Sequence, residues 1–142
     1  SVTPYLLIRG AGDAMAFYIK AFGAVEVLRL TAPDGKIAHA EIRIGNSHVM
    51  MADEHPEMEF FGPQTRGGTT VSLMIYVEDV DAVFARAIEA GGIELRPLCD
   101  QFYGDRSGTV TDPWGHVWTI ATHVEDVSPE DIASRFQAFF GE

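Results

Sequence analysis

Residues 37–44, IAHAEIRI, carry three side chains capable of chemistry at alternating positions. Because successive side chains of a strand point to opposite faces, His39, Glu41 and Arg43 share one face. A glutamate flanked by histidine and arginine can bind a polar ligand, or it can act as acid and base with a tuned histidine. The same row can instead form cross-strand ion pairs that keep an open sheet face soluble. The opposite row is apolar and suits packing on a helix: Ala38, Ala40, Ile42 and Ile44.

Three further histidines lie at turns or strand ends. His48 and His116 each follow a turn, where we expect structural hydrogen bonds to turn backbone rather than a pair of metal ligands. His123 ends the last predicted strand and alternates with Thr119. It can therefore reach the open sheet face or serve a structural role.

The segment CDQFYGDR, residues 99–106, combines thiol, aromatic and charged groups. Asp105 and Arg106 can brace a loop, which we favour, or the arginine can orient an anionic ligand group through its forked donors. Tyr103 beside them would add an aromatic wall to a pocket. The single cysteine, Cys99, is interpreted as a small buried hydrophobe rather than a reactive thiol.

Two tyrosines and one long segment complete the candidates for a ligand site. Tyr5 and Tyr76 lie on predicted first strands, where they can present hydroxyl groups to the same open face or be structural. Residues 54–69 contain prolines, glycines and no sustained periodicity, which predicts a linker or long loop. Its apolar side chains favour a lid over a pocket: Met58, Phe60 and Phe61.

A regular series of elements must position these groups. Strand formers predict strands over residues 3–9, 25–31, 37–44, 47–53, 70–77, 93–98, 108–111 and 116–123. Apolar residues at helical spacing predict one helix from Asp13, its N-cap, to residue 23, and another from Asp79 or Asp81 to residue 91. The expected buried faces are Ala14, Phe17, Tyr18, Ala21 and Phe22, then Val80, Val83, Phe84, Ala87 and Ile88.

The order strand, helix, strand, strand, strand therefore occurs twice, which predicts the α+β class. An ungapped offset of 68 residues places Asp13 on Asp81 and His48 on His116, although the two helical stripes then disagree by about two residues. We predict a single domain over residues 1–127, with module one at 3–53, a linker at 54–69 and module two at 70–123. A terminal helix is expected at 128–142, packed on its own subunit, with a partner subunit as the second choice.

The turn Asp112-Pro113-Trp114-Gly115 separates the last two predicted strands. Trp118, which alternates with Thr119, is expected in the core under a helix. Trp114, inside the turn, is also assigned to the core in preference to the pocket. The closing hairpin is therefore predicted to combine scaffold and pocket wall.

Composition excludes several classes of function. The chain has 142 residues, 46% of them hydrophobic, and a formal charge of −11. Such an acidic chain should repel nucleic acid and anionic membranes, so neither is expected as a partner. The absence of a signal-peptide pattern and of a second cysteine favours the cytoplasm.

The strings AFYIKAFGA, HAEIRIGNSHVMMADE and QFYGDRSGTVTDPWGHVWTIATHVEDV resemble the vicinal oxygen chelate superfamily, and more narrowly its PhnB-like branch. That superfamily includes glyoxalase I, extradiol dioxygenases, and the fosfomycin and bleomycin resistance proteins. The resemblance implies two tandem βαβββ modules whose curled mixed β-sheet encloses a cavity, with helices outside, and a homodimer. It implies a small organic molecule as ligand.

Metal-dependent members of that superfamily hold one divalent ion with residues of the first and fourth strands of each module. In this sequence the corresponding positions are Thr3 or Pro4, Met51, Val71 or Ser72, and Thr119. Such side chains lack the carboxylate or imidazole donors that these ions require. We therefore expect no metal cofactor, with Zn, Ni, Mn or Fe at a displaced site, such as His39 and Glu41, as the alternative.

The resulting prediction is a small-molecule-binding protein. The alternative is an enzyme: a metal-dependent lyase or dioxygenase, or a metal-free isomerase using His39 and Glu41. A third possibility, an interaction module, has only the terminal helix in its favour. The predicted ligand contacts are Tyr5, His39, Glu41, Arg43, Met51, Ser72, Tyr76, Tyr103, Arg106, Thr119 and His123.

Overall fold

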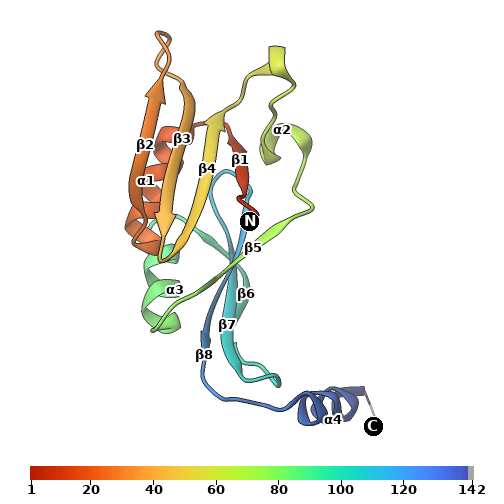
Figure 1. Cartoon of the computed structure of the whole chain (residues 1–142). Helices are drawn as coiled ribbons and strands as arrows, with labels where there is room; N and C mark the ends of the chain where they lie inside the picture. The colour runs from red at the N-terminus through yellow and green to blue at the C-terminus, as the bar shows by residue number, and fades with distance from the viewer. Residues whose placement is uncertain (141–142) are drawn as a thin grey trace.

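The computed structural model describes residues 1–140 and contains two four-stranded sheets (Figure 1). The first sheet has the order β1-β4-β3-β2 and the second β5-β8-β7-β6. The strands are β1 (Tyr5–Ile8), β2 (Val25–Thr31), β3 (Ile37–Ile44), β4 (Ser47–Asp53), β5 (Ser72–Tyr76), β6 (Ile93–Asp100), β7 (Asp105–Thr111) and β8 (Val117–His123). In each sheet the first strand of the module pairs in parallel with the fourth, and the other pairs are antiparallel. The predicted α+β class with two βαβββ modules is confirmed.

Helices α1 (Ala11–Phe22) and α3 (Val80–Glu89) each cover one face of a sheet, and α4 (Pro129–Phe140) follows module two. The segment predicted as a linker contains a short 3-10 helix, η1 (Pro56–Met58), and one helical turn, α2 (Pro63–Arg66). Within residues 1–140, no helix has both the length and the apolar character needed to cross a membrane. The last two residues of the expected terminal helix lie outside the described part of the chain.

The start of α1 corrects one prediction. Asp13 is not the N-cap, because the helix begins at Ala11 after Gly10, whose φ of 103° is in the left-handed region. The amides of Gly10 and Ala11 instead donate to Oδ1 of Asp53, at 2.9 Å each. Oδ2 of Asp53 accepts the amide of Ile37 at 2.6 Å. One nearly buried carboxylate therefore joins α1, β3 and β4.

Module two anchors its helix at the equivalent place with a hydroxyl group. Oγ1 of Thr122 accepts the amide of Val80 at 2.9 Å and donates to the carbonyl of Val77 at 2.8 Å. Asp79 is the N-cap, as one of the two predicted choices, and accepts the amide of Ala82. Asp53 and Thr122 therefore occupy equivalent positions in the two modules. The two residues are 69 positions apart, so the repeat offset is 69 rather than 68.

This one-residue change also aligns the helical stripes. At the new offset, Ala14 corresponds to Val83 and Met15 to Phe84, and all four side chains are buried. The mismatch between the two helical stripes at offset 68 therefore arose because the alignment of the two modules was short by one residue. Because strand side chains alternate, the same slip of one residue exchanges the two faces of a strand.

The modules are joined through Asp112 of the turn between β7 and β8. Oδ2 of Asp112 accepts the hydroxyl of Tyr18, at 2.6 Å, and the indole Nε1–H of Trp118, at 2.9 Å. Oδ1 accepts the amides of Trp114 and His116, at 3.0 Å each. Burial, followed by the charge of Asp112, raises the pKa of the Tyr18 phenol well above its usual value. The prediction that Trp118 lies in the core is confirmed, and the helix above it is α1 of the other module.

Three smaller expectations were wrong. Strand β7 begins at Asp105, so the Asp-Arg pair lies inside the strand rather than before it. Ala38 is exposed while Ile37 is buried, because the register of β2 and β3 shifts between Leu30 and Thr31. Ile88 stays 38% exposed at the end of the buried stripe of α3.

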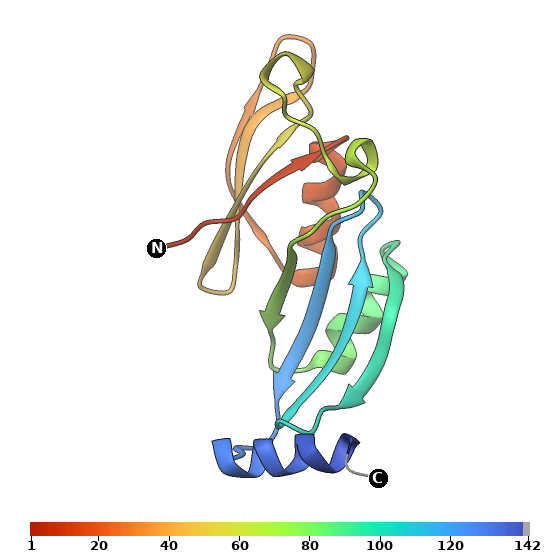
Figure 2. The same cartoon turned by 90° about the vertical axis from the view of Figure 1, so that its right-hand side faces the viewer.

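Each sheet keeps one face uncovered by its own helix, which we call its open face. In Figure 1 the first sheet is seen face on with α1 behind it, whereas the second sheet is seen edge on with α3 on its left. In Figure 2 the second sheet turns its open face to the viewer and the first sheet is seen edge on. Within one chain the two open faces therefore point in different directions.

Candidate functional site

The open face of the first sheet carries the predicted His39, Glu41 and Arg43 row. His39 Nδ1 lies 2.9 Å from the hydroxyl of Tyr5, and burial raises the pKa of that phenol. Nδ1 of His48 lies 2.7 Å from Oε2 of Glu41. His48 was expected to bind turn backbone, but it stands opposite Arg43 on β4 and so shares the open face. The sheet thus gathers two histidines, a tyrosine, a glutamate and an arginine.

Met51 was predicted to contact the ligand, but it is fully buried on the helix side of β4. It pairs with Leu6 and Ala40, both of which are core residues. The open-face residue is Met50, which lies opposite Tyr5 on one side and Glu41 on the other. The error follows from the repeat offset, because a one-residue slip moves a side chain to the other face of the sheet.

The open face of the second sheet is organised by Asp105, which is only 4% exposed. Its Oδ2 accepts the hydroxyl of Tyr76 at 2.7 Å, and its Oδ1 lies 3.0 Å from Nδ1 of His123. Nε2 of His123 lies 2.6 Å from Asp126. Hydrogen bonding to Asp105, then to Asp126, raises the pKa of His123. Both ring nitrogens face carboxylates, and only the protonated imidazole can donate to both.

Next to Asp105, the same open face carries a polar row of small side chains. Oγ1 of Thr109 lies 2.9 Å from Oγ1 of the predicted Thr119, and Nε2 of Gln101 donates to Oγ of Ser107 at 3.2 Å. Cys99, expected to be buried, is exposed beside this row. Register places it opposite Ser107 on the edge strand β6, where no strand covers it.

Arg106 is engaged in bracing, which was the favoured expectation. Its guanidinium binds Asp81 of α3 at 2.8 Å and Asp100 of β6 at 3.3 Å. The hydrogen bond from Arg106 lowers the pKa of Asp81. Arg106 alternates with Asp105 on β7 and therefore lies on the helix side, so its prediction as a ligand contact is corrected.

His116 has a structural role, as expected, but with another partner. Its Nε2 lies 3.1 Å from the carbonyl oxygen of Leu7 on β1, rather than from turn backbone. The residue is buried, and its backbone amide binds Asp112. Trp114 is partly buried and packs edge to face on Phe17, which agrees with its assignment to the core.

A crevice of about 1710 Å³ runs between the modules. The first sheet contributes Glu41, His48 and Met50 to its lining. The second sheet contributes Met74, Tyr76 and His123. Of the predicted ligand contacts, only Glu41, Tyr76 and His123 line this crevice. The others do not line it: Tyr5, His39, Arg43, Met51, Ser72, Tyr103, Arg106 and Thr119.

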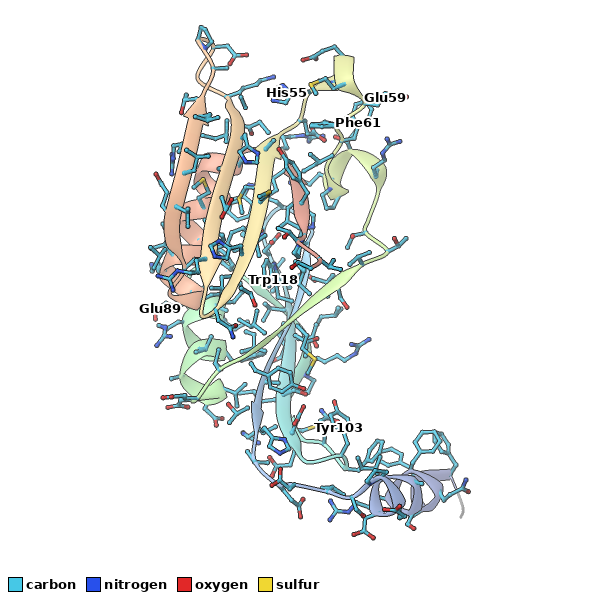
Figure 3. The ribbon with its side chains drawn as sticks, viewed as in Figure 1. His55, Glu59, Phe61, Glu89, Tyr103 and Trp118 are labelled. Carbon is cyan, nitrogen blue, oxygen red and sulfur yellow. The ribbon has the colours of Figure 1, made fainter. Side chains whose placement is uncertain are left out.

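The segment after β4, predicted as a lid over the pocket that Tyr103 would line, lies beside the first sheet instead. Figure 3 shows His55, Glu59 and Phe61 at the upper end of this sheet, far from Tyr103 at the lower end of the second. Phe60 approaches Tyr5 with a centroid distance of 6.3 Å. Tyr5 and Phe61 also line a smaller crevice of about 610 Å³.

The positions that correspond to the metal ligands of the superfamily carry no suitable set of donors for a divalent ion. The open-face pairs of the first and fourth strands are Tyr5 with Met50 and Met74 with Thr119. A phenol, two thioethers and a hydroxyl do not fit a divalent ion that prefers carboxylate or imidazole. No group of three His, Cys, Asp or Glu residues that could hold a metal occurs within residues 1–140.

Comparison with known proteins decides the family. The family profile described as the Glyoxalase/Bleomycin resistance protein/Dioxygenase superfamily matches residues 6–120. The chain belongs to this superfamily. An uncharacterized protein of Mycobacterium tuberculosis, Rv0887c, is 42% identical over 141 residues, covering 97% of this chain and 83% of that protein.

Several solved structures share the fold of this chain. The Arabidopsis thaliana gene product At5g48480 has a TM-score of 0.70 and 27% identity, covering 85% of this chain and 97% of that one. A Bacillus cereus structure described as a putative 3-demethylubiquinone-9 3-methyltransferase, PhnB protein, has a TM-score of 0.66 and 23% identity, covering 86% and 98%. The predicted superfamily is confirmed by the family profile.

Sequence reasoning missed Asp105 as the organiser of the second open face. The alternation of Asp105, Ser107 and Thr109 in DRSGT was a signal for a polar strand face. Its partners Tyr76 and His123 lie 29 and 18 residues away, so their convergence depends on the sheet topology.

Proposed function

We propose that the protein is a homodimer that binds a small organic molecule in the crevice between its modules. The open face of the first sheet in one copy would lie against the open face of the second sheet in the other. The protein would act in the cytoplasm, which its single unpaired cysteine favours.

The size and lining of the crevice support this proposal most strongly. Ligand pockets usually have volumes of about 300–1,000 Å³ and bury most of the ligand. A crevice of about 1710 Å³ is too large for that purpose until a further surface closes it. Its lining combines thioether and aromatic side chains with polar groups that can orient a ligand, as small-molecule sites do.

Exposed apolar groups on the open faces favour a second copy as that surface. Leu28 and Leu30 of the first sheet are 41% and 51% exposed, and Met74 and Tyr76 of the second are 45% and 61% exposed. Large exposed apolar patches mark interaction sites in soluble proteins. Packing one sheet face on the other would remove both from water.

The proposal is tested by sedimentation velocity and by binding of a hit from a thermal-shift screen of small molecules. A pocket ligand raises the melting temperature by mass action. Calorimetry measures the affinity of each variant for this hit. The affinity should fall in Tyr76→Ala and in the double variant His39→Ala, Glu41→Ala. It should stay unchanged in the distant control Glu89→Ala. Equal affinity in all variants, or a monomer at every concentration, would refute the proposal.

A second candidate function is metal-free acid–base catalysis at Glu41. The 2.7 Å contact between its carboxylate and His48 gives a proton donor and acceptor side by side on the crevice wall. Elemental analysis of protein purified without chelator separates this chemistry from a metal enzyme. Near-stoichiometric Zn, Ni, Mn or Fe retained after dialysis would contradict both metal-free functions.

A further inference from the structure

Helix α4 exposes an aromatic face. Phe136, Phe139 and Phe140 are 48%, 73% and 71% exposed, and no residue of Pro129–Phe140 is buried. Isolated helices of about 12 residues are marginal in water, and most helical stability comes from packing. This helix therefore requires a surface larger than the one its own chain supplies.

Contacts with its own chain fix the position of α4 but leave much of this face uncovered. The guanidinium of Arg135 donates to the carbonyl of Phe102 and to the carboxylate of Glu125, both at 3.0 Å. The ring of Phe102 approaches Phe136 and Phe139 with centroid distances of 5.9 Å. These contacts agree only in part with the expectation that the helix packs on its own subunit.

The position of α4 brings it next to the proposed dimer interface. In Figure 2 it lies crosswise below the ends of β7 and β8, and Figure 1 places it on the side of the second sheet opposite α3. This is the open side of that sheet. A module that packs on the open face therefore also meets α4.

Charge complementarity indicates which module of a second copy this is. Residues 1–53 contain five acidic and five basic residues, whereas residues 54–142 contain sixteen acidic and five basic residues. The whole formal charge of −11 thus falls on residues 54–142. Acids concentrate around the start of α4, at Glu125, Asp126, Glu130 and Asp131. Module one of another copy adds no net negative charge there, and its open face presents the exposed Arg43, with the exposed Lys36 in the turn between β2 and β3.

We infer that α4 is an intersubunit clasp, whose aromatic face packs on module one of a second copy of this chain. The inference rests on the proposed homodimer and deepens it, because it assigns the terminal helix to the partner. Clasps from both copies would hold the two open faces together at opposite ends of the assembly.

Mixed copies test this assignment. One set of copies carries Cys99→Ser and Ala138→Cys, with a spin label on the new cysteine and no isotope label. A second set carries Cys99→Ser alone and is isotope-labelled. The two sets are mixed. We expect loss of amide signal intensity within residues 1–53 of the isotope-labelled copies. The matched control, a label at Glu89→Cys on the helix side of module two, should leave these amides unchanged.

Two further variants measure the contribution of the aromatic face. Phe139→Ser with Phe140→Ser should raise the dimer dissociation constant roughly tenfold or more, because interface aromatics often dominate association energy. Gln137→Ala on the same helix should leave it unchanged. A dimer in which the isotope-labelled copies keep full amide intensity within residues 1–53, or whose dissociation constant is unchanged by the double variant, would overturn the clasp while the proposed dimer stands. A monomer at every concentration would overturn both.

Discussion

Module one and module two repeat the same elements but use their buried carboxylates differently. In module one, Asp53 binds three backbone amides on the helix side, and the open face holds the exposed Tyr5–His39 and Glu41–His48 pairs. In module two, a hydroxyl group anchors the helix, one buried carboxylate, Asp112, joins the modules, and another, Asp105, is on the open face. The second open face is therefore preorganised by a buried carboxylate, whereas the first keeps its polar groups accessible to a ligand.

The largest effect is expected from Asp53→Ala. Loss of this carboxylate leaves the amides of Gly10, Ala11 and Ile37 without their acceptor, which should lower the free energy of unfolding by about 3 kcal/mol or more. Urea unfolding followed by circular dichroism measures it. Asp13→Ala, in the first turn of the same helix, is the control and should cost less than about 1 kcal/mol. If both variants lost the same free energy of unfolding, the anchoring role of Asp53 would be contradicted.

The equivalent change in module two should be milder. Thr122→Val keeps the shape of the side chain but removes its bonds to Val80 and Val77, which should cost about 1–2 kcal/mol in the same unfolding experiment. A cost as large as that of Asp53→Ala would show that the modules anchor their helices equally strongly.

A pH-dependent contribution to stability is expected from His123 on the second open face. The raised pKa of His123 means that its stabilising contribution is fully present below about pH 6.5, its value in an unfolded chain, and is lost as the pH rises through the folded value. Titration by nuclear magnetic resonance should show a pKa above the usual histidine value. Asp126→Asn should lower it. An unchanged titration in this variant would argue against the bridge between Asp105 and Asp126.

The smallest effect on stability is expected from His48→Ala on the first open face. The histidine side chain is 46% exposed, and exposed ion pairs contribute about 0–1 kcal/mol. Unfolding should therefore change little, while affinity for a ligand found in the screen should fall. A large loss of stability would show that this pair is structural.

The sequence predicted the order of elements well because local patterns determine them. Strands β2, β3 and β4 have the predicted bounds, and the predicted helical face of α1 is buried. The bonds from Asp53 and Asp112 were not predictable, since their partners lie up to 94 residues away. Met51 was misplaced for a different reason, because the repeat offset was wrong by one residue and a strand has a period of two.

The bond between Tyr18 and Asp112 also bears on how the chain is made. Module one is complete at residue 53, but the partner of Tyr18 is synthesised 59 residues later, which takes on the order of 3–12 s at about 5–20 residues per second. During that interval the rings of Tyr18 and Phe22 lack Trp118, which covers them in the finished protein. The first half of the gene product therefore leaves the ribosome with an uncovered aromatic surface, and it is poorly suited to being expressed alone.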